Sequence, residues 1–126
     1  MIRILAVDDE PDFLMMVSLK LRKKGYEVTT AKDGEEALVR LEEALPDLVL
    51  LDIRMPKLNG FEVFARMKEN PKTAVIPVIF TSADATLDVM KLSLEAGAFG
   101  CLIKPFEGQE MLDTIRKCFP NEPFLK

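Results

Sequence analysis

The sequence predicts an α/β fold in which five parallel strands form one sheet with helices on both faces. Short apolar runs alternate with longer amphipathic stretches along the 126 residues, and glycine and proline separate these segments. One strand is apolar on both faces, which is typical of a sheet that is covered on both sides. Strands that alternate with helices in this way indicate a doubly wound domain. We expect one domain over residues 1–120, followed by a short tail at 121–126.

The first quarter of the chain contains a strand, a helix and a second strand. A run of β-branched and aliphatic residues predicts a strand over Ile2–Val7. Pro11 suits the first turn of a helix, and Gly25 suits the position where that helix stops. The amphipathic segment Tyr26–Ala31 then predicts a strand at an edge of the sheet.

The next segments predict a second helix and a central strand. Asp33 and Glu36 have the spacing of a capping box, which opens a helix that Pro46 ends. The segment Asp47–Leu51 is apolar on both faces and therefore predicts a buried strand. This strand leads directly into Asp52.

The rest of the chain repeats the alternation of helix and strand. Helical periodicity and β-branched runs predict three more helices and two more strands. In chain order these elements are the helix Phe61–Lys68, the strand Pro77–Thr81, the helix Asp84–Ala96, the strand Phe99–Ile103 and the helix Glu107–Phe119.

The charge and the amino terminus indicate where the protein acts. The net charge is −4 and no basic stripe occurs, which argues against direct nucleic-acid binding. No apolar run reaches the length that spans a membrane. The short apolar start runs straight into Asp8 and Asp9 instead of forming a signal peptide. We therefore expect a cytoplasmic protein without a membrane partner.

The sequence has no histidine and two cysteines, Cys101 and Cys118. The lack of histidine excludes Ser-His-Asp and Cys-His catalysis and histidine-ligated metals. In a reducing compartment we expect both cysteines to be buried thiols rather than a disulfide. Carboxylates, lysine and hydroxyl groups remain as the groups available for chemistry.

Polar side chains occur where four of the predicted strands end. The residues at these strand ends are Asp8, Asp9, Asp52, Thr81, Ser82 and Lys104. The carboxyl ends of parallel strands meet at one edge of the sheet, where ligands bind in open α/β folds. We therefore expect these side chains to form one site.

Clustered carboxylates with one lysine indicate a particular chemistry. Two like charges about 4 Å apart repel by roughly 4 kcal/mol at an effective dielectric constant near 20. A cluster of three carboxylates therefore needs a cation, and oxygen ligands of this kind suit Mg²⁺. A carboxylate beside Mg²⁺ can attack phosphorus and form an acyl phosphate, while a lysine stabilises the phosphoryl oxygens.

Four groups of residues resemble the motifs of one known family, and they cover nearly the whole chain. The groups are Val7-Asp8-Asp9-Glu10, Leu51-Asp52-Ile53-Arg54-Met55-Pro56 with Asn59-Gly60, Pro77-Val78-Ile79-Phe80-Thr81-Ser82-Ala83, and Lys104-Pro105-Phe106. Each group alone is weak evidence, but four in order at four strand ends are specific. The chain resembles the response-regulator receiver domain of bacterial two-component signalling.

The resemblance implies a flavodoxin-like sheet of strand order 2-1-3-4-5 and a Mg²⁺ site. It implies that Asp52 accepts the phosphoryl group. It also implies that Asp9, Asp52 and the main-chain carbonyl of Arg54 bind Mg²⁺ directly, and that Asp8 acts mainly through a water. The resemblance implies a protein that catalyses only its own phosphoryl transfer and dephosphorylation.

The same resemblance assigns the switch residues. Lys104 would bind the phosphoryl group, and the Lys104–Pro105 bond would be cis. Ser82 would be the switch hydroxyl, although Thr81 is a rival. Ser82 is preferred because the family places this hydroxyl directly before an alanine and five residues after a proline. Cys101 stands where the family often has an aromatic residue whose rotamer reports activation, so the output coupling is open.

The resemblance also implies partners. Because the chain has no histidine, its phosphohistidine donor would be a sensor histidine kinase or a histidine phosphotransfer protein. The leucine-rich helix Asp84–Ala96 allows two interpretations. It is either well buried, or it exposes an apolar patch for a downstream partner or a homodimer. Such a homodimer would use this helix with the strand Phe99–Ile103 and the helix Glu107–Phe119.

Three other classes of protein fit these residues less well. An aspartate-nucleophile phosphatase would place its second aspartate two residues after the first, whereas Asp8 and Asp9 are adjacent. A flavin-binding module would need a hydroxyl- or glycine-rich phosphate loop at that position. A degenerate receiver that only binds a partner would not need the full acidic set.

Two further expectations concern single side chains. We expect the methionines to lie in the core. These include Met15, Met16, Met67 and Met111. We also hypothesise that Arg54 and Asp84, which flank the site, form an ion pair that shields the acyl phosphate and slows its hydrolysis.

Overall fold

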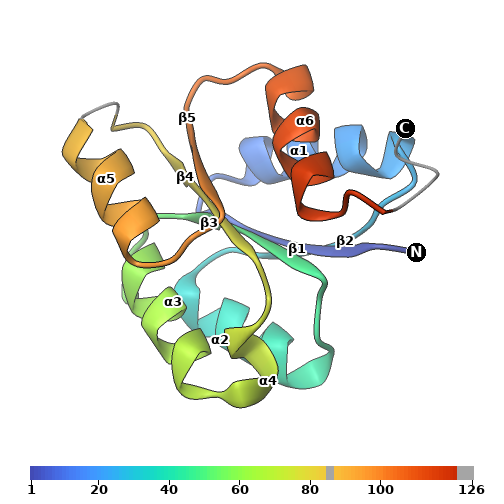
Figure 1. The fold of residues 1–126 in the computed structure, drawn as a ribbon. Coiled ribbons are helices and arrows are strands. Elements are labelled where there is room, and N and C mark those ends of the chain that lie inside the picture. The colour runs from blue at the N-terminus through green and yellow to red at the C-terminus, as the bar shows by residue number, and fades with distance from the viewer. Residues whose placement is uncertain (85–86, 122–126) are drawn as a thin grey trace.

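A computed structural model of the protein describes residues 1–84 and 87–121 (Figure 1). It contains one five-stranded sheet in which every pair of neighbouring strands is parallel. The strand order is β2-β1-β3-β4-β5, which confirms the predicted order. The strands are β1 Arg3–Val7, β2 Glu27–Ala31, β3 Leu48–Asp52, β4 Val78–Ser82 and β5 Gly100–Ile103.

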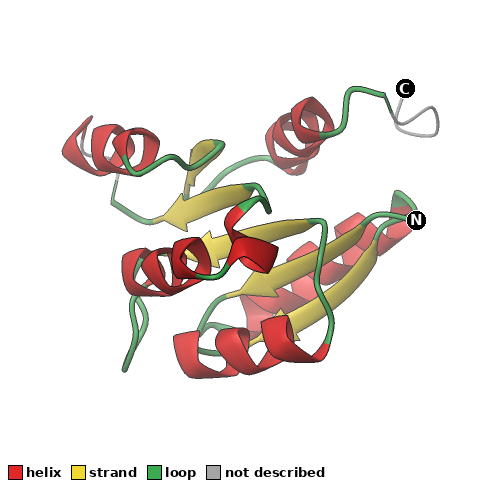
Figure 2. Ribbon diagram, turned by 60° about the horizontal axis from the view of Figure 1, so that its bottom comes forward, coloured by secondary structure: helices red, strands yellow, loops and turns green. Residues whose placement is uncertain are grey.

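Helices cover both faces of this twisted sheet (Figure 2). The helices are α1 Pro11–Lys23, α2 Gly34–Glu43, α3 Gly60–Glu69, α4 Pro71–Ala74, α5 Leu87–Glu95 and α6 Gly108–Cys118. Side chains of α1 and α6 pack on one face, and side chains of α2, α3 and α5 pack on the other. Most of the tail predicted at 121–126 lies outside the described residues, as do residues 85–86 of the helix predicted to begin at Asp84.

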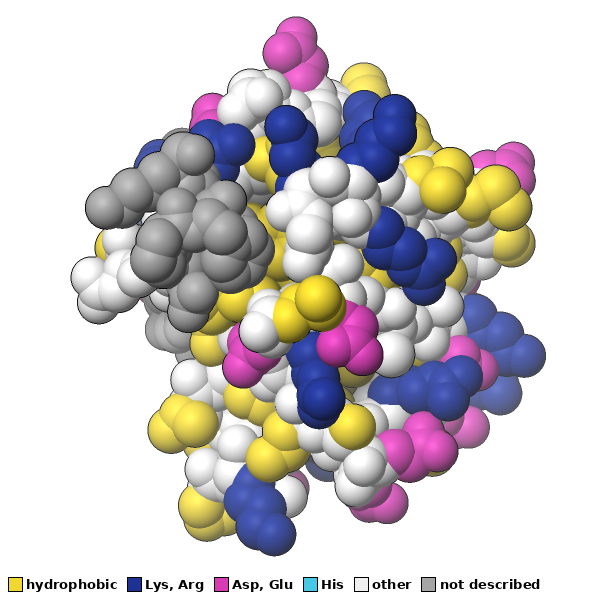
Figure 3. All heavy atoms as spheres, turned by 90° about the vertical axis from the view of Figure 1, so that its right-hand side faces the viewer, with side chains coloured by type: hydrophobic (Ala, Val, Ile, Leu, Met, Phe, Trp, Pro, Cys, Tyr) yellow, Lys and Arg dark blue, Asp and Glu magenta, His cyan; other side chains and the backbone are white. Residues whose placement is uncertain are grey.

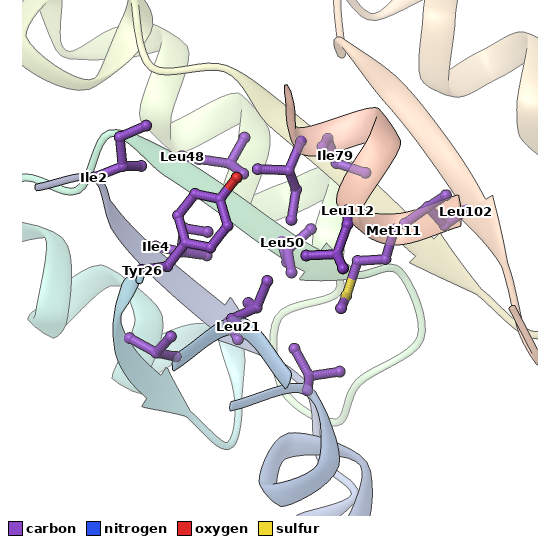
Figure 4. Close-up of a cluster of buried hydrophobic side chains, with 14 residues drawn as sticks. Ile2, Ile4, Leu21, Tyr26, Leu48, Leu50, Ile79, Leu102, Met111 and Leu112 are labelled. Carbon is purple, nitrogen blue, oxygen red and sulfur yellow. The ribbon is translucent and has the colours of Figure 1, made fainter. Parts of the chain in front are cut away.

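The central strand β3 supplies apolar side chains to both layers of the core. Leu48 and Leu50 belong to the cluster beneath α1 and α6, which Figure 4 shows. Val49 and Leu51 belong to the cluster on the opposite face. All five residues of β3, including Asp52, are buried. The acceptor candidate therefore lies at the end of a strand that the core holds on both sides.

Two local features differ from the sequence-based expectation. The four-residue helix α4 was not predicted, because four residues are too few to show a helical period. The Asp33 side chain accepts a hydrogen bond from the Glu36 N–H at 2.8 Å, as expected of a helix cap. The reciprocal capping box is found at α3 instead, where Asn59 and Glu62 bond each other's main-chain N–H at 2.9 and 3.0 Å.

The methionine prediction is partly wrong. Met67 and Met111 lie in the core, whereas Met15 and Met16 are 65% and 41% exposed. In α1 the buried face is taken by residues such as Val17, and the helical period turns its neighbours outward.

On the other face, α5 has exposed apolar side chains rather than a fully buried surface. Met90, Leu92 and Leu94 are 37%, 54% and 56% exposed. The interpretation of this helix as an exposed apolar patch is therefore favoured over that of a buried helix. Cys101 and Cys118 are both free thiols of intermediate burial.

The surface shows no extended basic region on the face drawn in Figure 3. Lysine and arginine side chains of the described residues lie there as separate groups among acidic, polar and apolar ones. Among the residues that the structure describes, no helix is both long and apolar enough to cross a membrane.

Candidate functional site

The predicted site residues lie along one edge of the sheet, where four parallel strands end. The register pairs Val7 with Leu51, Asp52 with Thr81, and Ser82 with Ile103. Asp8 follows β1 and Lys104 follows β5, so the chain delivers polar groups from four strands to the same edge.

Lys104 connects the carboxylates of this site. Its Nζ lies 2.6 Å from Oδ2 of Asp8, 3.7 Å from Oδ1 of Asp52 and 3.6 Å from Oε1 of Glu10. The side chain of Lys104 is 13% exposed, and those of Asp8 and Asp52 are 1% and 6% exposed. One largely buried ammonium group therefore contacts the acceptor candidate and the carboxylate that follows β1.

Burial and mutual repulsion perturb the acids of this site. Burial, reinforced by the negative charge of Asp8, raises the pKa of Asp52 to about 7, although Lys104 opposes this shift. Burial also raises the pKa of Asp8, against the hydrogen bond from Lys104. Burial alone would lower the pKa of Lys104, but its hydrogen bond to Asp8 and the charge of Asp52 outweigh that effect and raise it. The site thus has more negative charge than one lysine balances.

The donor atoms suit a hard divalent cation. Carboxylate oxygens of Asp8, Asp9 and Glu10 lie within 4.8 Å of one another, and Asp8 is fully buried. All of these donors are oxygen atoms, which Mg²⁺ prefers. Together with the excess negative charge, this donor set fits the Mg²⁺ that the sequence predicts.

The cluster differs from the predicted ligand set in two respects. It includes Glu10, to which the sequence assigned no role, and Asp52 joins it through Lys104 rather than directly. An open pocket beside the cluster is lined by Asp9, Ile53, Arg54, Met55, Pro56 and Asn59. Arg54 thus lies next to Asp9, while the role of its carbonyl stays a prediction.

The two hydroxyl candidates are both buried at the end of β4. Thr81 and Ser82 are each 2% exposed, and Thr81 is the register partner of Asp52. Oγ of Ser82 accepts a hydrogen bond from the main-chain N–H of Asp84 at 3.0 Å. Its own proton is therefore left to donate to another acceptor. The preference for Ser82 over Thr81 stays a prediction.

An ion pair spans the loops that follow β3 and β4. Nη2 of Arg54 lies 3.6 Å from Oδ2 of Asp84, and the two side chains are 81% and 25% exposed. The predicted pairing of these residues is therefore present. An exposed pair of this kind contributes about 0 to 1 kcal/mol to stability, so its effect would be on access to the site.

Two aromatic residues of the site were not predicted to act there. Nζ of Lys104 lies 4.3 Å from the ring centroid of Phe13, and Phe106 meets the Phe13 ring edge-on at 5.8 Å. The sequence predicted Phe13 only as part of the apolar face of α1. Its contact with Lys104 joins residues 91 positions apart, and such a contact leaves no pattern in the local sequence. The Lys104–Pro105 peptide bond is cis, as the resemblance implied.

Gly60 sets the close approach of α3 to the acceptor strand. Its N–H donates to the Ile53 carbonyl at 2.8 Å. A Cβ atom at this position would lie 2.4 Å from the main-chain oxygen of Asp52. Only glycine fits this contact without moving the backbone that carries Asp52.

The family model and the similar proteins agree on one family for this chain. Residues 4–116 match the family model of the response regulator receiver domain. The chain is 37% identical over 114 residues to the DNA-binding dual master transcriptional regulator RpaA of Synechocystis sp.. It is 39% identical over 115 residues to the alkaline phosphatase synthesis transcriptional regulatory protein PhoP of Bacillus subtilis. Each match covers 90% of this chain and 47% of the relative, so the chain spans about half the length of these relatives.

Solved structures of single receiver domains match almost end to end. The chemotaxis protein CheY4 of Vibrio cholerae superposes with a TM-score of 0.88 at 33% identity, covering 94% of this chain and 99% of that one. A receiver domain protein from Clostridium thermocellum superposes with a TM-score of 0.87 at 30% identity, covering 100% of both chains. The fold of this chain thus recurs in these proteins.

Proposed function

The chain belongs to the response-regulator receiver family, the phosphoacceptors of two-component signalling, and from this premise we propose that Asp52 is the residue that accepts the phosphoryl group. The observation that carries this proposal is the contact of one lysine, only 13% exposed, with both Asp8 and Asp52. A lysine so placed can stabilise negative charge that is added to Asp52.

The proposed transfer exchanges one bond to phosphorus for another. A carboxylate oxygen of Asp52 attacks the phosphorus of a partner's phosphohistidine. The P–N bond breaks, its electron pair returns to the imidazole, and an acyl P–O bond forms. In the later dephosphorylation step, water attacks the phosphorus and the acyl P–O bond breaks. This step releases inorganic phosphate and restores the carboxylate. The chain would thus act on its own aspartate and turn over no external substrate.

The cation site would be held by Asp8, Asp9 and Asp52, with the Arg54 carbonyl beside them and Glu10 as a further carboxylate. Bound Mg²⁺ would offset the negative charge of the carboxylates and of the transferring phosphoryl oxygens. Lys104, whose Nζ lies 3.7 Å from Oδ1 of Asp52, would bind the added phosphoryl group. The assignment of the ligands follows the resemblance, and the all-oxygen donor set, in which Asp8 and Asp52 are buried, supports it.

The donor would be a sensor histidine kinase or a histidine phosphotransfer protein. The 126 residues contain no histidine, so the phosphohistidine must lie outside them. Phosphorylation adds about −1.5 to −2 charge at Asp52, and Ser82 would donate its free proton to a phosphoryl oxygen. Movement of β4 and its loop toward the new charge would carry the signal to a downstream partner.

Labelling from a small phosphoryl donor tests the proposal. Wild type should incorporate label from radioactive acetyl phosphate only when Mg²⁺ is present, and Asp52→Asn should incorporate none. Asp47→Asn is the matched control, because Asp47 is an exposed carboxylate at the opposite end of β3. Equal labelling of wild type and Asp52→Asn would refute the proposal.

A further inference from the structure

The ammonium group of Lys104 has an aromatic neighbour in addition to the carboxylates that it contacts. The Phe13 ring lies beneath it at 4.3 Å from Nζ to the ring centroid. Phe106 meets Phe13 at 5.8 Å between centroids with an interplanar angle of 85°, an edge-to-face contact. Because the Lys104 side chain is only 13% exposed, this ring helps to keep water from the ammonium group.

We propose that Phe13, braced by Phe106, is a positioning residue that holds the Lys104 ammonium group ready to move from Asp8 to a phosphoryl group on Asp52. This inference rests on the proposed function, because it concerns how Lys104 serves the same reaction. Phe13 touches no reacting atom and acts through the lysine.

The distances explain why a ring suits this task better than a polar group. In the structure, Nζ of Lys104 is 2.6 Å from Asp8 and 3.7 Å from Asp52. To stabilise a phosphoryl group, the ammonium must give up the short contact and move toward Asp52. Attraction to an aromatic face has no single acceptor atom, so it persists while the cation moves across the ring. A hydrogen-bond acceptor in the same place would instead hold the ammonium at one point.

A purely structural role for Phe13 is the alternative. Phe13 also packs against the core cluster beneath α1. However, Val17 and Leu21 fill the buried face of this helix at 1% and 0% exposure, whereas Phe13 is half-buried. A structural role predicts a loss of stability without a specific effect on phosphoryl transfer, so rate and stability must be measured separately.

The chain contains a matched control pair. Nζ of Lys68 lies 5.0 Å from the ring centroid of Phe64, and this contact is on α3 rather than at the carboxylate site. Phe64→Leu therefore removes the same kind of contact and the same volume on the opposite face of the sheet.

The test compares the rate of Mg²⁺-dependent labelling from acetyl phosphate in four proteins. Phe13→Leu should lower the rate by about fivefold, and Phe13→Tyr, which keeps the ring, should restore it to within about twofold of wild type. Phe64→Leu should lower the melting temperature and leave the rate unchanged. A wild-type rate for Phe13→Leu, or equal slowing by Phe13→Tyr, would overturn the inference.

A double-mutant cycle separates positioning from structure. In a Lys104→Ala background, Phe13→Leu should cause no further slowing, because the ring acts through the ammonium group. If Phe13→Leu slowed labelling fivefold in both backgrounds, Phe13 would have a purely structural role and the inference would be overturned. Failure of the proposed function would instead show as Asp52→Asn labelling as fast as wild type. The contact itself has an independent readout: ring-current shifts of the Lys104 ε-methylene protons should be present in wild type and Phe13→Tyr and lost in Phe13→Leu.

Discussion

At the scale of single residues, Asp52 occupies a position where its negative charge is unfavourable unless a cation is bound. Burial and the charge of Asp8 raise its pKa to about 7, and Lys104 compensates only in part. Such a perturbed acid at the end of a buried strand is typical of functional sites rather than of structural ones. This buried charge should lower the free energy of unfolding of the metal-free protein by a measurable amount.

Replacing Asp52 should therefore stabilise the metal-free protein. In the unfolded chain this acid has its ordinary pKa of 3.8, so between pH 3.8 and about 7 the folded protein holds a proton that the unfolded chain has released. The contribution of this group to the free energy of unfolding is therefore greatest below pH 3.8. It is lost as the pH rises through about 7. At pH 8 without Mg²⁺, Asp52→Asn should raise the unfolding free energy by about 2 kcal/mol and the melting temperature by about 5 to 10 °C.

Thermal unfolding followed by circular dichroism checks this expectation. The gain should vanish near pH 3.5, where the carboxyl group is protonated in both states, and Asp47→Asn should show no comparable gain. A lower melting temperature for Asp52→Asn at pH 8 would contradict the electrostatic account of the site.

At the scale of elements, the site lies where the strands end, and the sequence predicts these strand ends. The predicted strand Asp47–Leu51 corresponds to β3 Leu48–Asp52, and Pro77–Thr81 corresponds to β4 Val78–Ser82. Runs of β-branched and aliphatic residues carry this information locally. The contact of Phe13 with Lys104 was not predictable in the same way, because it depends on how α1 packs beside β5. The role of Glu10 in the acidic cluster was missed for a similar reason, since its reach toward Lys104 is a tertiary contact.

The junction between β3 and α3 should tolerate no side chain at Gly60. A Cβ atom there would lie 2.4 Å from the main-chain oxygen of Asp52, so Gly60→Ala must displace the acceptor strand. We expect a loss of about 2 kcal/mol in unfolding free energy and at least a tenfold slower labelling of Asp52. Urea unfolding and acetyl phosphate labelling measure the two effects.

Gly100→Ala is the matched control for this substitution. A Cβ atom at Gly100 would make only an ordinary contact with Thr114 at 3.6 Å. Its labelling rate should stay near that of wild type. If Gly60→Ala behaved like Gly100→Ala, the close packing of α3 on Asp52 would not affect phosphorylation of Asp52.

The loops after β3 and β4 should control the lifetime of the phosphorylated state. The Arg54–Asp84 ion pair joins these loops at 3.6 Å beside the acceptor. Replacing both residues by alanine should open the approach of water and shorten the phosphoryl half-life by about threefold, with little change in stability. The decay of radiolabelled protein after donor removal measures this, and an unchanged half-life would exclude a shielding role for the pair.

At the scale of the whole molecule, apolar side chains are exposed on α5 and at the start of the segment that leads into β5. Met90, Leu92 and Leu94 lie on α5, and Phe99, at 43% exposure, directly precedes β5. The sequence left open whether this surface serves a downstream partner or a second copy of the chain. Cys101 on β5 is small and offers no aromatic rotamer to transmit the signal, so we expect movement of the Ser82 loop to transmit it instead.

Self-association through this surface is a prediction that can be checked in solution. We expect a phosphoryl mimic such as beryllium fluoride with Mg²⁺ to promote a dimer, which Leu92→Lys should abolish. Sedimentation velocity over a range of protein concentrations distinguishes monomer from dimer. A monomer at high concentration with and without the mimic would leave the surface to a different partner.

The central claim is that phosphorylation takes place on the carboxylate of Asp52. Its most direct test is borohydride reduction of protein phosphorylated with acetyl phosphate and Mg²⁺, which converts an aspartyl phosphate to homoserine, followed by peptide mass spectrometry. The account predicts homoserine at position 52 in wild type and at no position in a sample without Mg²⁺. Homoserine at another aspartate, or a phosphorylated protein with position 52 unmodified, would contradict it.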